Sequence, residues 1–180
     1  MSRPCVFFDR DGIVNESPGP GYVERVADFK LVPAFFDALR VVRDRGYAAV
    51  IVTNQRGVGR GLMSRATLDA IHAVLRAACA ERGCPLLAIY DCTANDNTDP
   101  RRKPNPGMLL QAAREHDLDL SRSWMIGDNE KDVQAGQRAG CRTILVHLQP
   151  SVTSADHVLP AMEKLPPLLE KVLANAKTLD

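Results

Sequence analysis

Short runs of consecutive apolar residues alternate along this chain with longer segments in which apolar residues recur every three or four positions. Continuous apolar runs are typical of strands that are covered on both faces, whereas the longer spacing indicates amphipathic helices. The runs predict strands at Cys5–Asp9, Ala48–Thr53, Leu87–Asp91, Trp124–Gly127 and Thr143–His147. The longer segments predict helices at Ala34–Arg45, Arg65–Arg82, Gly107–His116 and Lys131–Ala139. Because strands and helices alternate, we expect a central parallel sheet with helices on both faces.

Two further segments lie outside this alternation. The chain after Pro160 predicts a final helix, interrupted by Pro166-Pro167, that packs on the rest of a single domain spanning residues 1–180. The segment Asn15–Phe29 predicts a long loop, and loops of this length in compact domains are often functional. Since this loop follows directly after two aspartates, we expect it to rim a site. The alternative is a plain surface loop.

Composition and charge exclude several classes of function. The 180 residues are 45% hydrophobic and 25% charged, which is ordinary for a globular protein. A net charge of +1 without any basic run gives no electrostatic basis for binding nucleic acid. No stretch approaches the roughly 18 apolar residues of a membrane span, and the N-terminus carries no signal-like segment. We therefore expect a cytoplasmic protein. It is expected to be a monomer, because each predicted helix commits its apolar face to the sheet.

Two aspartates follow the first predicted strand, with one residue between them. In an extended chain, Asp9 and Asp11 point to the same side, so both can face a crevice at the carboxyl end of the strand. Carboxylates held this close repel each other unless a cation binds between them or one of them is protonated. The pair therefore indicates a hard cation such as Mg²⁺ together with a nucleophile and an acid/base. The alternative is a solvated Asp-Gly turn.

Three more groups of polar residues follow predicted strands. Thr53-Asn54-Gln55 precedes a glycine-rich loop with two arginines and suits a phosphate, although a flexible turn is the alternative. Lys103 precedes Pro104, which keeps it out of helical conformation and gives either a fixed charge or a solvated basic loop. Asp128 offers a third carboxylate to a metal, and Asp132, one helical turn further, can reach the same ion through water. Asp128 is equally suited to cap the next helix, as are Asn129 and Asp132.

Together these four groups resemble the haloacid dehalogenase (HAD) superfamily of phosphohydrolases. The matching motifs are Asp9-Arg10-Asp11-Gly12, Thr53-Asn54-Gln55, Lys103, and Gly127-Asp128 with Asp132. The residues of these motifs resemble those of subclass III, the group that contains D-glycero-D-manno-heptose 1,7-bisphosphate phosphatases and histidinol-phosphate phosphatase domains. The resemblance implies a Rossmann-like α/β three-layer sandwich with a central parallel sheet. We expect no separate cap domain, because the segments between the motifs are short, so loops must close the site.

The resemblance also implies a mechanism and a set of site residues. Asp9 would attack phosphorus to form an aspartyl-phosphate, and Asp11 would protonate the leaving alkoxide and then activate water. Mg²⁺ would bind Asp9, the backbone carbonyl of Asp11, and Asp128, with Asp132 nearby. The side chains expected to bind the substrate or its phosphate are Arg10, Thr53, Asn54, Gln55, Arg56, Arg60, Arg102, Lys103 and Asn129. Within this set, the arginines after Gln55 are candidates for a second phosphate.

The chain departs from the family pattern where members usually carry a zinc loop. The five cysteines are scattered without a Cys-x-x-Cys pair, so neither a disulfide framework nor a zinc knuckle is indicated. Cys92 remains from the family's zinc ligands, but Ala94, Asp99 and Arg101 stand where the others would be. One thiolate cannot hold a structural zinc, which takes four ligands, so we expect no zinc.

Two further departures concern the substrate. Arg56 and Asn129 stand where the heptose enzymes tend to have serine and lysine. We expect a Mg²⁺-dependent phosphomonoesterase acting on a small molecule, such as heptose 1,7-bisphosphate. Histidinol phosphate or another small phosphomonoester is the alternative substrate. A non-catalytic binding domain of the same fold is the third possibility, against which the intact set of aspartates and Lys103 argues.

Overall fold

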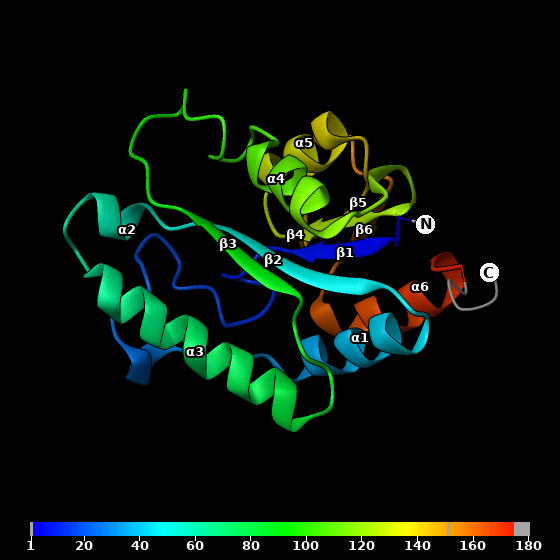
Figure 1. Ribbon diagram of the computed structural model, residues 1–180, viewed down its shortest axis with the longest axis horizontal. Helices are drawn as coiled ribbons and strands as arrows, with labels where there is room; N and C mark the ends of the chain where they lie inside the picture. The colour runs from blue at the N-terminus through cyan, green and yellow to red at the C-terminus, as the bar shows by residue number, and fades with distance from the viewer. Residues whose placement is uncertain (1, 151, 175–180) are drawn as a thin grey trace.

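The computed structural model describes residues 2–150 and 152–174, which form a six-stranded parallel sheet in the order β3-β2-β1-β4-β5-β6 (Figure 1). The strands are β1 (Cys5–Phe8), β2 (Ala48–Asn54), β3 (Ala88–Cys92), β4 (Trp124–Gly127), β5 (Arg142–Val146) and β6 (His157–Leu159). Strand β1 pairs with β2 on one side and with β4 on the other. The strand order therefore reverses beside β1, and a crevice opens at the carboxyl ends of these central strands.

Helices cover both faces of the sheet. The helices are α1 (Pro33–Asp44), the short α2 (Arg56–Gly59), α3 (Arg65–Glu81), α4 (Gly107–His116), α5 (Glu130–Ala139) and α6 (Leu165–Val172). Single 3-10 turns lie at Val26–Asp28, Leu120–Arg122 and Met162–Lys164. Helices α4 and α5 lie on one face, and α1, α3 and α6 lie on the other (Figure 1). This is the α/β three-layer sandwich that the sequence predicts.

Each face of the sheet has its own hydrophobic core. In β1, Val6 and Phe8 belong to the core under α1, α3 and α6, whereas Cys5 and Phe7 belong to the core under α4 and α5. Successive strand residues point to opposite faces, so a strand buried on both sides must be apolar throughout. This explains why β1 appears in the sequence as a continuous apolar run.

The five predicted strands and the four predicted helices before Pro160 are confirmed to within one residue at each end, whereas the final helix begins at Leu165 and not directly after Pro160. Strand β6 and helix α2 were not predicted, because they contain only three and four residues and show no usable periodicity. The prediction that Pro166-Pro167 interrupts the final helix is wrong. Both prolines lie in the first turn of α6, where no intrahelical partner for a backbone N–H is required. No helix in the described part of the chain has the length and apolar character needed to cross a membrane.

One buried ionisable group in the fold has no role in the active site. His72 of α3 is 7% exposed, its Nδ1 lies 4.0 Å from Oδ1 of Asp91, and its Nε2 has no hydrogen-bond partner among the described residues. Burial, together with the guanidinium of Arg10, lowers the pKa of His72 to about 4, although the carboxylate of Asp91 opposes this shift. Smaller effects come from Arg65, which lowers this pKa, and from Asp69, which raises it. His72 is therefore neutral in the folded protein at neutral pH.

We predict that His72 makes the protein less stable in mild acid. In the unfolded chain, histidine takes up a proton as the pH falls below about 6.5, while the folded protein resists protonation until its lower pKa is reached. The free energy of unfolding should therefore fall by about 2 kcal/mol between neutral pH and about pH 5 through this group alone. Urea unfolding of wild type and His72→Leu at both pH values measures the difference. The leucine variant should lose less stability, while His147→Leu, which alters an exposed histidine, should follow wild type. Equal losses in all three proteins would contradict the assignment.

Candidate active site

A cavity of about 250 Å³ opens at the carboxyl ends of β1, β2 and β4. The predicted site residues that line it are Asp9, Asp11, Thr53, Asn54, Arg102, Lys103, Asp128, Asn129 and Asp132. Residues 17–19, 21 and 22 also line it, which confirms that the loop after the aspartate pair rims the site. Four of the predicted residues, Arg10, Gln55, Arg56 and Arg60, do not line this cavity.

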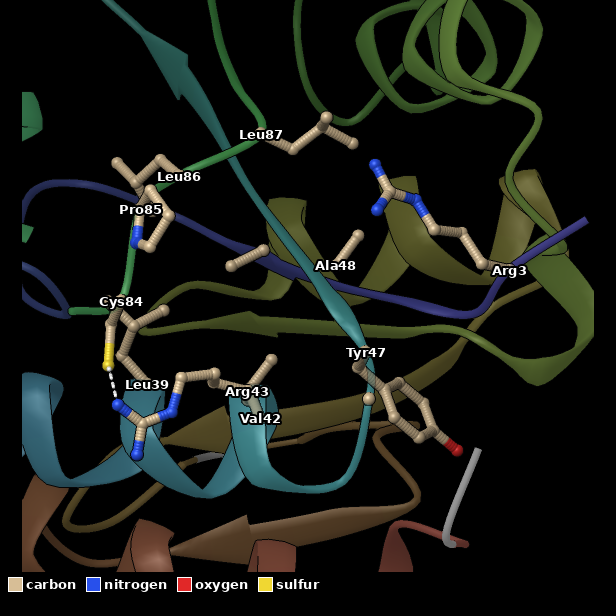
Figure 2. A pocket seen from close by; sticks show the side chains of 12 residues that line it. Arg3, Leu39, Val42, Arg43, Tyr47, Ala48, Cys84, Pro85, Leu86 and Leu87 are labelled. Carbon is tan, nitrogen blue, oxygen red and sulfur yellow. Dashed lines mark hydrogen bonds between the residues drawn. The ribbon is translucent and has the colours of Figure 1, made fainter. Parts of the chain in front are cut away.

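A larger cavity, of about 420 Å³, lies at the amino-terminal ends of the strands, between α1, the start of β2 and the residues before β3 (Figure 2). Its walls are mostly apolar, including Leu39, Val42 and Leu86, with Arg3 and Arg43 at its sides. The guanidinium of Arg43 contacts the thiol of Cys84 at 3.4 Å. No acidic side chain lines this cavity, so it lacks the carboxylates that line the smaller one.

Lys103 lies at the centre of the carboxylate-lined cavity. Its Nζ is 2.7 Å from Oδ1 of Asp9, 2.6 Å from Oδ1 of Asp132 and 2.8 Å from the carbonyl oxygen of Val52. These contacts use all three donors of an ammonium group whose residue is only 3% exposed. Burial alone would lower the pKa of Lys103, but the carboxylates of Asp132 and Asp9 outweigh it and raise that pKa. The side chain is therefore a permanent positive charge at the bottom of the site.

The backbone of Lys103 is held in place by Asn54 at the end of β2. The side-chain Nδ2 of Asn54 donates to the carbonyl oxygen of Lys103 at 2.9 Å, and the N–H of Lys103 donates to Oδ1 of Asn54 at 3.0 Å. The side chain of Asn54 thus holds the backbone of Lys103 in place. The backbone N–H of Asn54 is then the group of this residue that can face a phosphate. Thr53 lies beside it, 1% exposed, and its Oγ1 accepts a hydrogen bond from Gln55.

Three carboxylates meet next to this lysine. Oxygen atoms of Asp9, Asp128 and Asp132 all lie within 4.8 Å of one another. Burial raises the pKa of Asp9 to about 8, against the opposing effect of Lys103, and the two neighbouring carboxylates contribute to the rise. Burial and Asp132 likewise raise the pKa of Asp128 to about 6. Such crowding of oxygen ligands fits a hard divalent cation, whose charge would relieve the repulsion.

The close approach of Asp128 to the first motif depends on a glycine. Gly12 has a φ of 87°, and a Cβ at this position would lie 2.1 Å from Oδ2 of Asp128. A side chain here would displace the carboxylate and strain the backbone. Gly12 therefore allows the carboxylate of Asp128 to approach the first motif closely, in addition to forming a turn.

Asp132 is fixed by the start of α5. Asn129 is the N-cap of this helix, and its Oδ1 accepts from the N–H of Lys131 at 3.1 Å, while Oδ2 of Asp132 accepts from the N–H of Asn129 at 3.1 Å. This reciprocal capping box leaves the other carboxylate oxygen of Asp132 for Lys103. Of the open alternatives, Asn129 and Asp132 form the cap, and Asp128 does not. Asn129, predicted to bind phosphate, uses its side-chain oxygen in the cap.

Asp11 lies in a different hydrogen-bonding environment from Asp9. Its carboxylate accepts from Nη2 of Arg10 at 2.9 Å, from Nδ2 of Asn15 at 2.9 Å and from Nε2 of Gln55 at 3.0 Å. We correct the prediction that Arg10 and Gln55 contact the substrate, since both are buried and directed at Asp11. The Arg10 guanidinium also lies over the ring of Phe29, 5.7 Å from its centroid.

Asn15 was not predicted as a site residue, although its place four residues after Asp11, in the turn that follows the motif, is a usable signal. It is fully buried, and its Nδ2 contacts the carbonyl oxygen of Glu16 as well as Asp11. The residues around Asp11 thus hold this carboxylate in one orientation at the edge of the cavity.

The three predicted arginines that follow Gln55 have different surroundings. Arg102 is 6% exposed and lines the cavity, with Nε 3.1 Å from Oδ1 of Asn97 and Nη1 3.2 Å from the carbonyl oxygen of Ala94. Arg56 lies on α2 and donates to the carbonyl oxygen of Asn95 at 2.8 Å. Arg56, predicted to bind phosphate, does not line the cavity, and the loop in which it was expected begins with the short helix α2. Arg60 is exposed outside the cavity.

Three loops pack on one another beside the cavity. A Cβ on Gly57 would lie 3.1 Å from the ring of Tyr22, and one on Gly59 would lie 2.1 Å from the carbonyl oxygen of Thr93. Asn95 also donates to the carbonyl oxygen of Gly59 at 2.7 Å. Of the three loops expected to close the site, Asn15–Phe29 and Thr93–Arg102 contribute residues to the cavity wall, whereas Arg56–Met63 contributes none and packs on the other two. Within residues 2–150 and 152–174, no separate helical or sheet layer covers the cavity.

The loop after β3 is held by hydrogen bonds between protein groups. Nδ2 of Asn105 donates to the carbonyl oxygens of Asn97 and Asp99 at 3.1 and 2.8 Å. Cys92 is 2% exposed and belongs to the core under α4 and α5. Among the described residues, the group of three or more possible metal ligands is the aspartate cluster next to Lys103. The side chain of Asn105 therefore holds two points of this loop together.

We predict that Asp132→Ala destabilises the protein markedly. The change removes one partner of a buried ammonium group and part of a helix cap, so the free energy of unfolding should fall by about 3 kcal/mol. Chemical denaturation of the metal-free protein measures this loss without any assay of activity. Asp37→Ala, which removes an exposed carboxylate from a surface ion pair, should cost less than about 0.5 kcal/mol. Equal stability of the two variants would mean that Lys103 does not depend on Asp132.

Comparisons with known proteins agree with this geometry. Residues 100–162 match a family model described as HAD-hydrolase-like. A D-glycero-D-manno-heptose-1,7-bisphosphate 7-phosphatase of Thermosynechococcus vestitus is 39% identical over 160 residues, which cover 81% of this chain and 80% of the relative. A D-glycero-beta-D-manno-heptose-1,7-bisphosphate 7-phosphatase of Yersinia pestis is 36% identical over 180 residues, covering 92% and 95%.

The fold comparison leads to the same group. The crystal structure of a D,D-heptose 1,7-bisphosphate phosphatase from B. bronchiseptica, complexed with magnesium and phosphate, matches with a TM-score of 0.83 and 30% identity. The match covers 93% of this chain and 98% of that one. From the motifs, the sheet topology and these relatives, the chain belongs to the HAD phosphatases, in the group of the heptose-1,7-bisphosphate phosphatases.

Proposed function

We propose that this protein is a Mg²⁺-dependent phosphatase that removes one phosphate from a heptose 1,7-bisphosphate through a covalent aspartyl-phosphate. The observation that carries the proposal is the arrangement of Asp9, Asp128 and Asp132 around the ammonium group of Lys103, beside a second, separately held carboxylate at Asp11. The relatives named above act on heptose bisphosphates and support this substrate class.

In the first half-reaction, a carboxylate oxygen of Asp9 attacks phosphorus and the bond between phosphorus and the sugar oxygen breaks. The new bond makes an acyl phosphate on Asp9, so one difficult displacement becomes two easier ones. Lys103 is hydrogen-bonded to Asp9 and holds this carboxylate in place, while its charge offsets that of the arriving phosphate. The hydroxyl of Thr53 and the backbone amide of Asn54, which line the same cavity, can hold phosphoryl oxygens.

Asp11 is the group that handles protons. It donates a proton to the leaving sugar oxygen, and then accepts one from the water that attacks the acyl phosphate, which releases inorganic phosphate and restores both aspartates. The contacts from Arg10, Asn15 and Gln55 hold this carboxylate apart from Asp9. The two aspartates thus have separate roles because their surroundings differ.

The carboxylates of Asp9 and Asp128, together with the backbone carbonyl of Asp11, would hold Mg²⁺, with Asp132 close by. When bound, the ion screens the charge between the nucleophile and the phosphate and orients the phosphoryl oxygens. We propose that no zinc is needed, since Cys92 alone remains of the family's zinc ligands. The enzyme is proposed to act as a monomer on a small molecule.

We predict that the purified enzyme releases inorganic phosphate from heptose 1,7-bisphosphate when Mg²⁺ is present, and that chelation by EDTA abolishes this reversibly. Asp9→Asn should lower the rate at least about a thousandfold, because an amide is a poor nucleophile, while the melting temperature stays close to that of wild type or rises. The assay should include both anomers, histidinol phosphate and p-nitrophenyl phosphate. Asp37→Asn is the matched control, since it makes the same chemical change at an exposed position and should keep the wild-type rate.

The outcomes separate substrate from chemistry. Turnover that persists in EDTA or in Asp9→Asn would contradict the mechanism. A clear preference for histidinol phosphate or for another ester would retain the mechanism and overturn the heptose assignment. No turnover of any ester with Mg²⁺ would overturn both and favour a binding domain.

A further inference from the structure

The charges in the active-site cavity suggest where a second anionic group would bind. Four carboxylates, those of Asp9, Asp11, Asp128 and Asp132, line the cavity. Two cations are bonded directly to them, Arg10 to Asp11 and Lys103 to Asp9 and Asp132. A divalent ion held by the aspartate cluster would balance the remaining negative charge. The site's own acidic groups therefore require no further cation.

Arg102 is a cation that is not needed to neutralise these four carboxylates. Its guanidinium is held by an amide oxygen and a carbonyl oxygen, those of Asn97 and Ala94, and both are neutral acceptors. It forms no ion pair with a carboxylate in the part of the chain that the structure describes. Because the residue is 6% exposed and lines the cavity, its charge is partly desolvated and lies at the cavity wall, where it can attract an anionic group of a bound molecule.

Lys131 is a second such cation, and it was not singled out in the sequence. It is the second residue of α5, is exposed, and lines the same cavity. No carboxylate of residues 2–150 or 152–174 lies within 4.0 Å of its ammonium group. Its backbone N–H is held by the side chain of Asn129, which fixes the point from which the long side chain extends. The N-terminus of α5 adds positive potential at the same place.

We propose that Lys131 is a specificity-determining residue that binds the second, non-reacting phosphate of the substrate, together with the already positioned Arg102. This inference rests on the proposed function. Two unpaired cations match the charge of a phosphate dianion, and a flexible ammonium group can reach a group whose position varies with the sugar. The sequence offers Arg56, Arg60 and Arg102 for this role, and of these three arginines only Arg102 lines the cavity.

The test compares a substrate that carries a second phosphate with one that does not. The substrates are heptose 1,7-bisphosphate and p-nitrophenyl phosphate, and the variants are Lys131→Gln and Lys131→Arg. Loss of one charged contact should raise KM for the bisphosphate about tenfold more than KM for p-nitrophenyl phosphate in Lys131→Gln. Lys131→Arg, which keeps the charge, should restore most of the affinity. Lys171→Gln, the same change on the exposed side of α6, should match wild type with both substrates.

Wild type is measured first with both substrates, so that failure of the proposed function is recognised separately. If wild type hydrolyses the bisphosphate and Lys131→Gln shows the same KM as wild type, the inference is overturned and the proposed function stands. An equal rise in KM for both substrates, or a fall in kcat without a change in KM, would also overturn it. A selective rise that high salt diminishes would support it, because screening weakens an exposed charge contact.

Discussion

The buried ammonium group of Lys103 is the contact on which the site depends. It joins the nucleophile candidate Asp9, at the end of β1, to Asp132, at the start of α5, with bonds of 2.7 and 2.6 Å. Its charge opposes the burial and the two neighbouring carboxylates that raise the pKa of Asp9, so it offsets part of the repulsion within the aspartate cluster. Because the lysine backbone is clamped by Asn54, the positions of three strand ends are linked through a single side chain.

The surroundings of this contact explain how a small fold without a cap can form an enclosed site. Tyr22, Gly57, Gly59 and Thr93 bring three loops into mutual contact above the strand ends. A Cβ at Gly59 would collide with the carbonyl oxygen of Thr93 at 2.1 Å, and a Cβ at Gly57 would make a tight contact of 3.1 Å with the ring of Tyr22. Such an arrangement leaves one side open, so specificity must come from charged groups at the rim of the cavity more than from a closing domain.

The sequence predicts the ends of the strands well and the contacts between them poorly. Strand β1 is recognisable because both its faces are buried, and Asp9 follows it because polar site residues begin where that burial ends. The partners of Lys103 were not predictable, since they join residues far apart in the chain that only the sheet order brings together. Arg10 was expected to face a substrate because a sequence pattern does not show which way a loop side chain points; its guanidinium instead contacts Asp11 and the ring of Phe29.

The central claim is that Asp9 carries the phosphoryl group during turnover. The most direct measurement is to stop the reaction with acid during turnover of heptose 1,7-bisphosphate in the presence of Mg²⁺, and to map acyl phosphate on the peptides by mass spectrometry. The account predicts a phosphorylated aspartate in the peptide that contains Asp9, and none in the Asp9→Asn protein. Phosphate release from substrate with the phosphoryl group on another residue, or with no covalent species on any peptide under conditions that preserve a reference acyl phosphate, would contradict it.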